Sequence, residues 1–291
     1  MKLLSYQSDT GPRVAGVRQG GPNGSPAYVD LNRADPRIPP SMRELLAQWP
    51  EGLSRAAAAV KAGRALPAAG LKLLAPVPDP QKVICVGLNY ADHAKESGAA
   101  IPAEPVIFSK FPTAVSAHDA LIVLPSVSKC VDYEAELVVV IGRGGRHIPR
   151  ERALDHVAGY CPGHDVSARD WQMHKSAGQW LLGKTFDTFA PFGPYLTTTD
   201  EVPDPNALEI ALRLNGQVMQ HSSTRQFIFK VQDLVAYISD VFTLTPGDVI
   251  FTGTPPGVGF ARKPPVYLKP GDVCEVEIEG LGVLRNPVVA E

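Results

Sequence analysis

Residues 131–140 read VDYEAELVVV, a run of aliphatic and β-branched residues that predicts a buried β-strand. Because successive strand side chains alternate between faces, Glu134 and Glu136 project from the same face, with Cα atoms roughly 6.6–7 Å apart. Two carboxylates that face an apolar interior repel each other and resist losing water unless a cation lies between them. The alternative is a solvent-facing strand edge with ordinary acids, but the aliphatic continuation of the strand favours a bound cation.

A third carboxylate, Asp165, ends the next apolar stretch, residues 157–165. Three oxygen ligands on rigid elements, with positions left for water or substrate, suit Mg²⁺ or Mn²⁺. The sequence therefore predicts a divalent metal site formed by Glu134, Glu136 and Asp165, which Ca²⁺ could also occupy in crystals.

The composition is that of a soluble globular protein: 291 residues, 44% hydrophobic, 20% charged and a net charge of −2. This charge gives no reason to expect nucleic acid or an anionic membrane as a partner, and no apolar run is long enough to span a bilayer. The four cysteines form no CxxC pair and are expected to be buried free thiols. Residues 1–8 contain no sustained apolar segment, so we expect a cytoplasmic protein.

The chain divides at a proline-rich connector, residues 74–80, into a small N-terminal α+β domain (1–75) and a catalytic domain (76–291). Strand patterns dominate the second part, and Asn215-Gly216 predicts a tight hairpin. Helical patterns are fewer, notably Ser167–Lys175 and Lys230–Phe242. The prediction is a β-rich α+β fold with a partly closed sheet, and not a doubly wound sheet.

Polar residues near Asp165 could bind an anionic substrate. Arg169 and Gln172 share a helix face in the predicted helix, where an arginine can grip a carboxylate and the amide can donate a hydrogen bond. A surface ion pair is the alternative for Arg169. Asp170, three residues after Ser167, is interpreted as a helix-capping acid.

Three further segments could contribute to catalysis. Lys184 lies among apolar residues, where it could stabilise an oxyanion or take part in proton transfer, or else be a surface lysine with a buried stem. His93 and Glu96 share a helix face as expected of a general base for water, although a solvent-exposed pair has the same spacing. Residues 89–102 could form a mobile lid over the site. Thr254 could bind a substrate carboxylate or simply stabilise its turn.

Taken together, these segments resemble the fumarylacetoacetate hydrolase family, whose motifs they match in order over residues 82–290. The matching motifs are Val86-Gly87-Leu88-Asn89-Tyr90 with His93 and Glu96, Phe108-Ser109-Lys110, Tyr133-Glu134-Ala135-Glu136, Asp165-Val166-Ser167-Ala168-Arg169-Asp170, Gly183-Lys184-Thr185-Phe186-Asp187 and Thr252-Gly253-Thr254-Pro255. Residues 179–184 and 262–266 look closest to the subgroup of fumarylacetoacetate hydrolase domain-containing protein 2. His164 is a departure, because many members have asparagine there.

The resemblance implies a rolled, mixed β-sheet fold and a homodimer. It places Mg²⁺ or Mn²⁺ on the three carboxylates, catalytic roles on His93, Glu96 and Lys184, and substrate binding on four further residues: Lys110, Arg169, Gln172 and Thr254. Family substrates are 2-oxo or 2,4-dioxo carboxylic acids.

Such an acid can chelate the ion and form a metal-bound enolate, from which several reactions can follow. Our first choice from the sequence is hydrolysis of a C–C bond in an acylpyruvate-type acid, such as a compound like fumarylpyruvate or fumarylacetoacetate. The alternative is an oxaloacetate tautomerase or decarboxylase. A metal-binding protein without catalysis would be a third class, and the complete set of motif residues argues against it.

Overall fold

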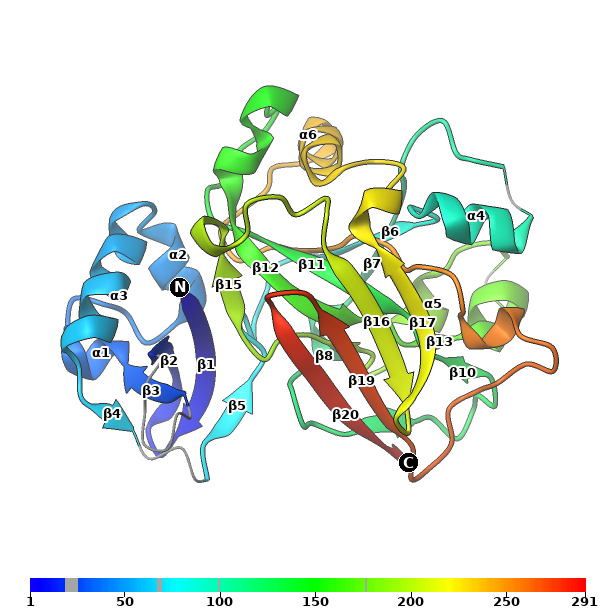
Figure 1. Cartoon of the computed structure of the whole chain (residues 1–291), viewed down its shortest axis with the longest axis horizontal. Coiled ribbons are helices and arrows are strands. Elements are labelled where there is room, and N and C mark those ends of the chain that lie inside the picture. Colours follow the sequence, from blue (N-terminus) through cyan, green and yellow to red (C-terminus); the bar gives the residue numbers. More distant parts are fainter. Residues whose placement is uncertain (19–25, 67–69, 99, 176) are drawn as a thin grey trace.

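The computed structural model describes residues 1–18, 26–66, 70–98, 100–175 and 177–291, and its strands form one long sheet and one smaller sheet (Figure 1). In spatial order the long sheet contains β4 (Ala65–Leu66), β3 (Ala27–Asp30), β2 (Gly11–Arg18), β1 (Lys2–Ser8), β15 (Leu196–Thr198), β12 (Val157–His164), β11 (Ala135–Ile141), β18 (Val249–Phe251), β6 (Val83–Gly87) and β7 (Val106–Lys110), with β5 (Lys72–Leu74) also paired to β1. The smaller sheet contains β17 (Gln217–Ser223), β16 (Glu209–Leu214), β19 (Val273–Ile278), β20 (Gly282–Ala290) and β9 (Ile122–Leu124).

Two short pairs complete the strands: β10 (Val131–Asp132) with β13 (Ser167–Ala168), and β14 (Ala190–Pro191) with β8 (Val115–Ser116). The α-helices are α1 (Leu31–Ala34), α2 (Met42–Ala47), α3 (Glu51–Ala62), α4 (Ala91–Ser97), α5 (Leu181–Lys184) and α6 (Val231–Val241). Most strand pairs are antiparallel, but β6 with β18, β9 with β20 and β8 with β14 are parallel. The predicted strand-rich α+β fold with mixed sheets is therefore confirmed.

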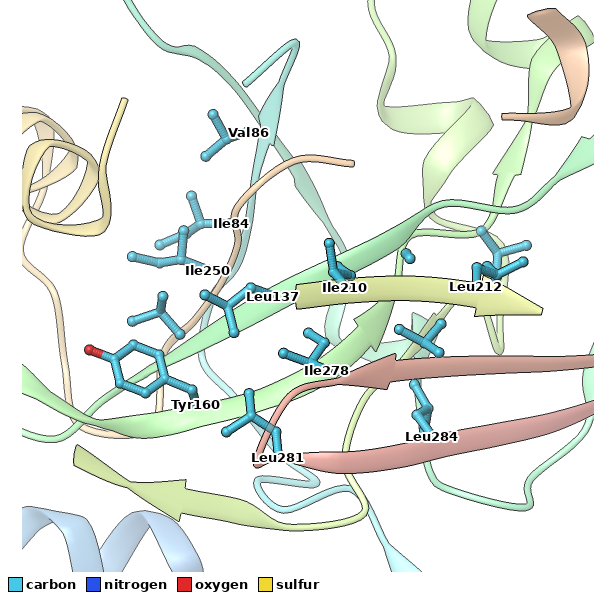
Figure 2. Packing of buried hydrophobic residues seen from close by; sticks show 14 of the residues in the cluster. Ile84, Val86, Leu137, Tyr160, Ile210, Leu212, Ile250, Ile278, Leu281 and Leu284 are labelled. Carbon is cyan, nitrogen blue, oxygen red and sulfur yellow. The ribbon is translucent and has the colours of Figure 1, made fainter. Parts of the chain in front are cut away.

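Strand β11 lies at the centre of the core because its aliphatic residues are buried on both faces. Figure 2 shows Leu137 among Ile210 and Ile278, which come from the smaller sheet packed on this face. The neighbouring Val138 belongs to a second buried cluster on the other face, together with Phe251. A strand packed on both sides is held rigidly, so the carboxylates at its beginning have a fixed position.

The predicted Asn215-Gly216 hairpin is confirmed. It joins β16 to β17, and both turn residues have positive φ, 53° for Asn215 and 80° for Gly216. This is the backbone conformation that the two-residue turn requires and that asparagine and glycine tolerate best.

The segment predicted as a helix over Ser167–Lys175 has a different structure at its beginning. Ser167 lies in β13, and its hydroxyl donates to the carbonyl of Asp165 instead of capping a helix. The helical turn begins at Arg169, and Trp171–Lys175 are of the π type. Asp170 accepts hydrogen bonds from the Ser128 hydroxyl at 2.6 Å and from the Trp171 N–H at 3.1 Å. The strand pairing with β10 overrides the local capping pattern, which sequence spacing alone could not indicate.

The N-terminal strands do not form an isolated sheet, because β1 pairs with β15 through the Lys2↔Thr197 register and so continues the long sheet. Figure 1 shows β1–β5 and α1–α3 gathered at one end of the molecule. A domain boundary near residue 75 remains a proposal.

All four cysteines are free: Cys85, Cys161 and Cys274 are buried, and Cys130 is half-buried. In the described part of the chain, no helix combines the length and the apolar character needed to cross a membrane.

The sheet order brings several strand ends together at one edge. Strands β6 and β18 are parallel and therefore end on the same side, whereas β11 is antiparallel to β18 and begins there. Strand β12 is antiparallel to β11 and ends there, with His164 opposite Ala135. The segments that follow β6, β12 and β18 thus converge on the beginning of β11.

Candidate active site

The three predicted metal ligands meet at this edge. Glu134 directly precedes β11, Glu136 lies within it and Asp165 follows β12. Their carboxylate oxygens lie within 4.8 Å of one another, and all three residues are buried. The period-two spacing of the glutamates therefore produces the convergence that the sequence predicts.

Three buried cations surround these carboxylates. Lys184, at the end of α5, donates to Glu134 Oε2 and to Asp165 Oδ2, each at 2.8 Å. Arg169 Nη2 lies 2.6 Å from Glu134 Oε1, and Lys110 Nζ lies 2.5 Å from Asp165 Oδ1. Lysine and arginine heads that are buried this completely are stable only because each is paired.

The electrostatic balance differs between the two glutamates. Burial raises the pKa of Glu134, but Lys184 and Arg169 overcome this effect and hold that pKa at about 2. Burial raises the pKa of Glu136 well above its usual value, and the neighbouring charges of Asp165 and Glu134 add to the rise. The Gly253 N–H donates to Glu136 Oε2 at 2.8 Å and only partly offsets it. Glu136 is the carboxylate that most needs additional positive charge.

The donor set fits a divalent ion. With Asp132, which contacts Arg169, the site contains four carboxyl groups against Lys110, Arg169 and Lys184, so that with all four ionised it carries one net negative charge. Closely spaced carboxylate oxygens are the ligands preferred by hard divalent cations. Glu134, Glu136 and Asp165 could hold such an ion, and the net charge would then become positive.

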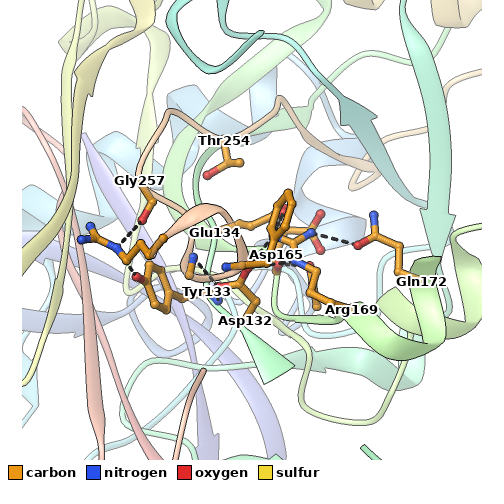
Figure 3. A network of polar contacts seen from close by, with 12 residues as sticks. Asp132, Tyr133, Glu134, Asp165, Arg169, Gln172, Thr254 and Gly257 are labelled. Carbon is orange, nitrogen blue, oxygen red and sulfur yellow. Dashed lines mark hydrogen bonds and ion pairs between the residues drawn. The ribbon is translucent and has the colours of Figure 1, made fainter. Parts of the chain in front are cut away.

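Asp132 is a site residue that the sequence analysis did not assign. It lies beside Arg169 (Figure 3) and accepts from Arg169 Nε at 2.8 Å. It also accepts from the backbone N–H groups of Gly259 and Phe260 at 2.7 and 3.1 Å. The Phe260 ring covers the guanidinium of Arg169 at 4.5 Å. Asp132 thus orients Arg169 and, through the two backbone hydrogen bonds, holds the loop that contains Gly259 and Phe260 against the site. Its position two residues before Glu134, in the same period-two pattern, was an available signal.

Changing Asp132 to asparagine should lower turnover about 10- to 100-fold, the usual effect of removing a residue that orients another site group. The amide keeps the shape but removes the charge that faces Arg169. Binding of the divalent ion, measured by calorimetry, should change much less than turnover. Asp170→Asn is the matched control, because this acid contacts Ser128 and not Arg169. Equal losses in both variants would contradict the assigned role of Asp132.

The His93–Glu96 pair is formed in α4, with 3.3 Å between His93 Nδ1 and Glu96 Oε2. Glu96 also accepts from the N–H of Gly257 at 3.1 Å, and Asp92 accepts from the Ser222 hydroxyl at 2.5 Å. In this structure α4 is therefore docked on the neighbouring loop. Of the predicted lid, residues 89–102, residue 99 lies outside the described residues.

A cavity of about 210 Å³ opens onto the carboxylates. Its lining includes most of the predicted site residues: His93, Glu134, Glu136, Asp165, Arg169, Gln172, Lys184 and Thr254. Gln172 accepts from Arg169 Nη1 at 2.9 Å, and the Thr254 hydroxyl accepts from Gln220 Nε2 at 2.9 Å. Glu96 is not among the described residues that line the cavity, but it contacts His93, which is.

Lys110 is placed differently from the prediction. It is not among the described residues that line this cavity, and its ammonium group is fully buried against Asp165 and the carbonyls of Val166 and Phe189. Lys110 therefore neutralises Asp165 from behind, and the expectation that it contacts substrate is not supported.

His164 points away from the three carboxylates, because it shares a strand face with Ala135 and not with Glu136. It is fully buried, and neither ring nitrogen has a hydrogen-bond partner among the described residues. Burial lowers the pKa of His164 to about 3, so the ring is neutral. Within the described residues, His164 therefore makes no hydrogen bond to Glu134, Glu136 or Asp165.

Comparison with known proteins gives one consistent family. The model of the fumarylacetoacetate (FAA) hydrolase C-terminal family matches residues 82–289. Similar proteins include the mitochondrial oxaloacetate tautomerase fahd2 of Xenopus laevis, 48% identical over 99% of this chain and 90% of that protein. The mitochondrial oxaloacetate tautomerase FAHD2A of Homo sapiens is 49% identical over 99% of this chain and 92% of its own.

Solved structures agree on the fold. The fumarylacetoacetate hydrolase of Exiguobacterium antarcticum has a TM-score of 0.86 and 37% identity, covering 100% of both chains. The 5-carboxymethyl-2-hydroxymuconate delta-isomerase of Mycobacterium smegmatis has a TM-score of 0.79 and 37% identity, covering 100% of this chain and 99% of that one. The predicted fold is thereby confirmed beyond its secondary structure.

The cytoplasmic location expected from the sequence is contradicted, because the names of these relatives place them in mitochondria. That expectation rested on composition and on residues 1–8. Residues 2–8 form β1, so their sequence reflects the pairing of this strand in the sheet and does not predict in which compartment the protein lies.

Proposed function

Because the chain belongs to the fumarylacetoacetate hydrolase family, we propose that this enzyme is an oxaloacetate tautomerase, which interconverts the keto and enol forms of oxaloacetate. This is the alternative of the sequence analysis, and we prefer it to C–C hydrolysis. The observation that carries the proposal is the 48–50% identity, over 99% of the chain, to relatives named oxaloacetate tautomerase.

The charge of the site suits a small dianion. Arg169, Lys184 and the bound ion together would make the cavity positive, which favours an acid with two carboxylates. A divalent cation, for which we propose Mg²⁺ or Mn²⁺, would supply positive charge that stabilises negative charge developing on the substrate. Gln172 and Thr254 line the same cavity and would orient the substrate by hydrogen bonds.

Tautomerisation needs only proton transfers. A proton leaves C3, a proton joins the C2 oxygen, and no carbon–carbon bond is broken and no water is consumed. His93 lines the cavity and is oriented by Glu96, so it can accept the C3 proton and return one to oxygen.

Lys184 is suited to a different role. Burial disfavours its charge, but Asp165 and Glu134 overcome this effect and raise its pKa above the usual value. The lysine therefore remains protonated and serves as a hydrogen-bond donor and a positive charge, not as a base.

The lining of the cavity also suits an enolate. Val86, Phe108 and Trp180 make part of the wall apolar, and such a wall excludes water from an enolate.

C–C hydrolysis is the second candidate, because the same His93–Glu96 pair could activate a water. A spectrophotometric comparison of enol-oxaloacetate, acetylpyruvate and fumarylpyruvate, each with Mg²⁺ or Mn²⁺, separates the two. We expect the decay of enol-oxaloacetate to have the highest kcat/KM. Faster cleavage of either acylpyruvate would reverse the order of the two proposals.

A homodimer is also proposed, from the family resemblance alone. Sedimentation equilibrium of the purified chain would measure its mass directly.

A further inference from the structure

Two aromatic rings form one wall of the cavity. Trp180 immediately precedes α5, the short helix that brings Lys184 to the carboxylates. Its ring packs edge-to-face against Phe108, with centroids 5.4 Å apart and planes at 68°. Both rings line the cavity, and Lys184 Nζ lies 5.1 Å from the Phe108 centroid. The wall therefore stands directly beside the charged groups of the site.

The position of the Trp180 ring is fixed by a glycine. A Cβ atom added to Gly87, at the end of β6, would lie 2.4 Å from Trp180 Cζ3 and 2.9 Å from Cη2. The ring thus rests on bare backbone, and any larger residue at position 87 would displace it. Contacts with Gly87 and with Phe108 thus hold the half-buried ring in this position.

A second hollow of about 580 Å³ adjoins the wall. Phe108 lines both spaces, and the residues on either side of Trp180, Gln179 and Leu181, line the second one. Ile84 and Ile107 make part of its surface apolar. Phe108 therefore lies between the charged cavity and the larger space, and Trp180 packs against Phe108 on the cavity side.

We propose that Trp180, seated on Gly87 and braced by Phe108, determines substrate length by closing the site to 2-oxo acids longer than four carbons. This inference rests on the proposed function, because it explains why a site of this chemistry would prefer oxaloacetate to longer 2,4-dioxo acids. Such an acid carries an acyl tail beyond C4, and the wall formed by Phe108 and Trp180 stands beside the space into which that tail would extend. Shortening the Trp180 side chain would enlarge the cavity beside Phe108 and give such a tail more room.

The test measures binding rather than turnover. Calorimetry on the Mg²⁺-loaded full chain gives dissociation constants for oxalate, which has no tail, and for 2,4-dioxooctanoate, which has a long one. For Trp180→Ala we expect the ratio of the long-acid constant to the oxalate constant to fall at least about tenfold, the lower end of what a few methylenes decide in a pocket. Trp180→Leu should lower the ratio in the same direction.

Leu182→Ala is the matched control, because this exposed residue lies on the same short helix and outside both lining sets. An unchanged ratio in this variant together with the fall in both Trp180 variants supports the proposal. An unchanged ratio in the Trp180 variants overturns it, as does a wild-type protein that binds the long acid as tightly as oxalate. Loss of oxalate binding in both Trp180 variants would assign the residue a structural role and overturn it too.

The outcome is separable from that of the proposed function. If the wild-type chain does not convert enol-oxaloacetate but the binding ratio responds to Trp180, the tautomerase proposal fails and the length barrier stands. If the wild-type chain converts enol-oxaloacetate but the binding ratio does not respond to the Trp180 substitutions, the tautomerase proposal stands and the length barrier fails.

Discussion

Replacing Glu136 with glutamine should remove nearly all turnover, at least about 10²-fold, together with the response of the rate to added Mg²⁺ or Mn²⁺. Glu136 is buried, and Asp165 and Glu134 add to the burial that raises its pKa, so it is the carboxylate with the strongest need for a cation. The amide keeps nearly the same shape and can still accept from the Gly253 N–H, but it brings no negative charge. The measurement is kcat as a function of metal concentration, with bound metal determined by calorimetry.

The same substitution should not destabilise the metal-free protein. A buried carboxylate beside two others costs free energy when it is charged, so its removal should leave the melting temperature of the metal-free protein equal or higher. Glu209→Gln, on the exposed side of β16, is the control and should change neither property. A Glu136→Gln variant that keeps wild-type kinetics in the presence of a chelator would show that the metal assignment is wrong.

Replacing His93 with alanine should slow tautomerisation by about 10²- to 10⁴-fold, the range for a positioned acid–base group. His93 lines the cavity and is oriented there by Glu96. The alanine substitution therefore removes the proposed proton carrier and leaves the metal ligands in place. The readout is exchange of the C3 proton of oxaloacetate for deuterium, followed by NMR. Glu96→Gln should lower the rate too, but by a smaller factor, because the imidazole of His93 remains and loses only the charge of its partner.

His147→Ala is the control for this experiment, since it removes an exposed imidazole that pairs with Asp240. Metal affinity should be unchanged in both histidine variants. If C3 exchange in His93→Ala were as fast as in the wild type, another group would have to carry the proton, and α4 would only cover the site.

The sequence was sufficient for those parts of the site that follow from local periodicity. Glu134 and Glu136 are one residue apart in an aliphatic strand, so their common face follows from strand geometry alone. Asn215-Gly216 likewise determines its own turn, whatever packs around it. These features require no knowledge of distant residues.

The features that could not be predicted depend on contacts between distant segments. Lys110 reaches Asp165 from β7, 55 positions earlier in the chain, and no local pattern distinguishes a substrate contact from a buried counter-charge. The pairing of β10 with β13 places Ser167 in a strand despite its helix-capping pattern. The wall formed by Phe108 and Trp180 could not be predicted either, because the two rings come from separate segments and meet only in the folded chain.

NMR of oxaloacetate labelled with ¹³C at C3 and C4, with the wild-type enzyme and Mg²⁺, tests the tautomerase proposal most directly. We predict that exchange between the keto and enol signals accelerates with enzyme concentration, that EDTA abolishes the acceleration, and that the C3–C4 coupling persists because no carbon–carbon bond is cut. Loss of that coupling at a rate comparable to the exchange, or exchange no faster than without enzyme, would contradict the proposal.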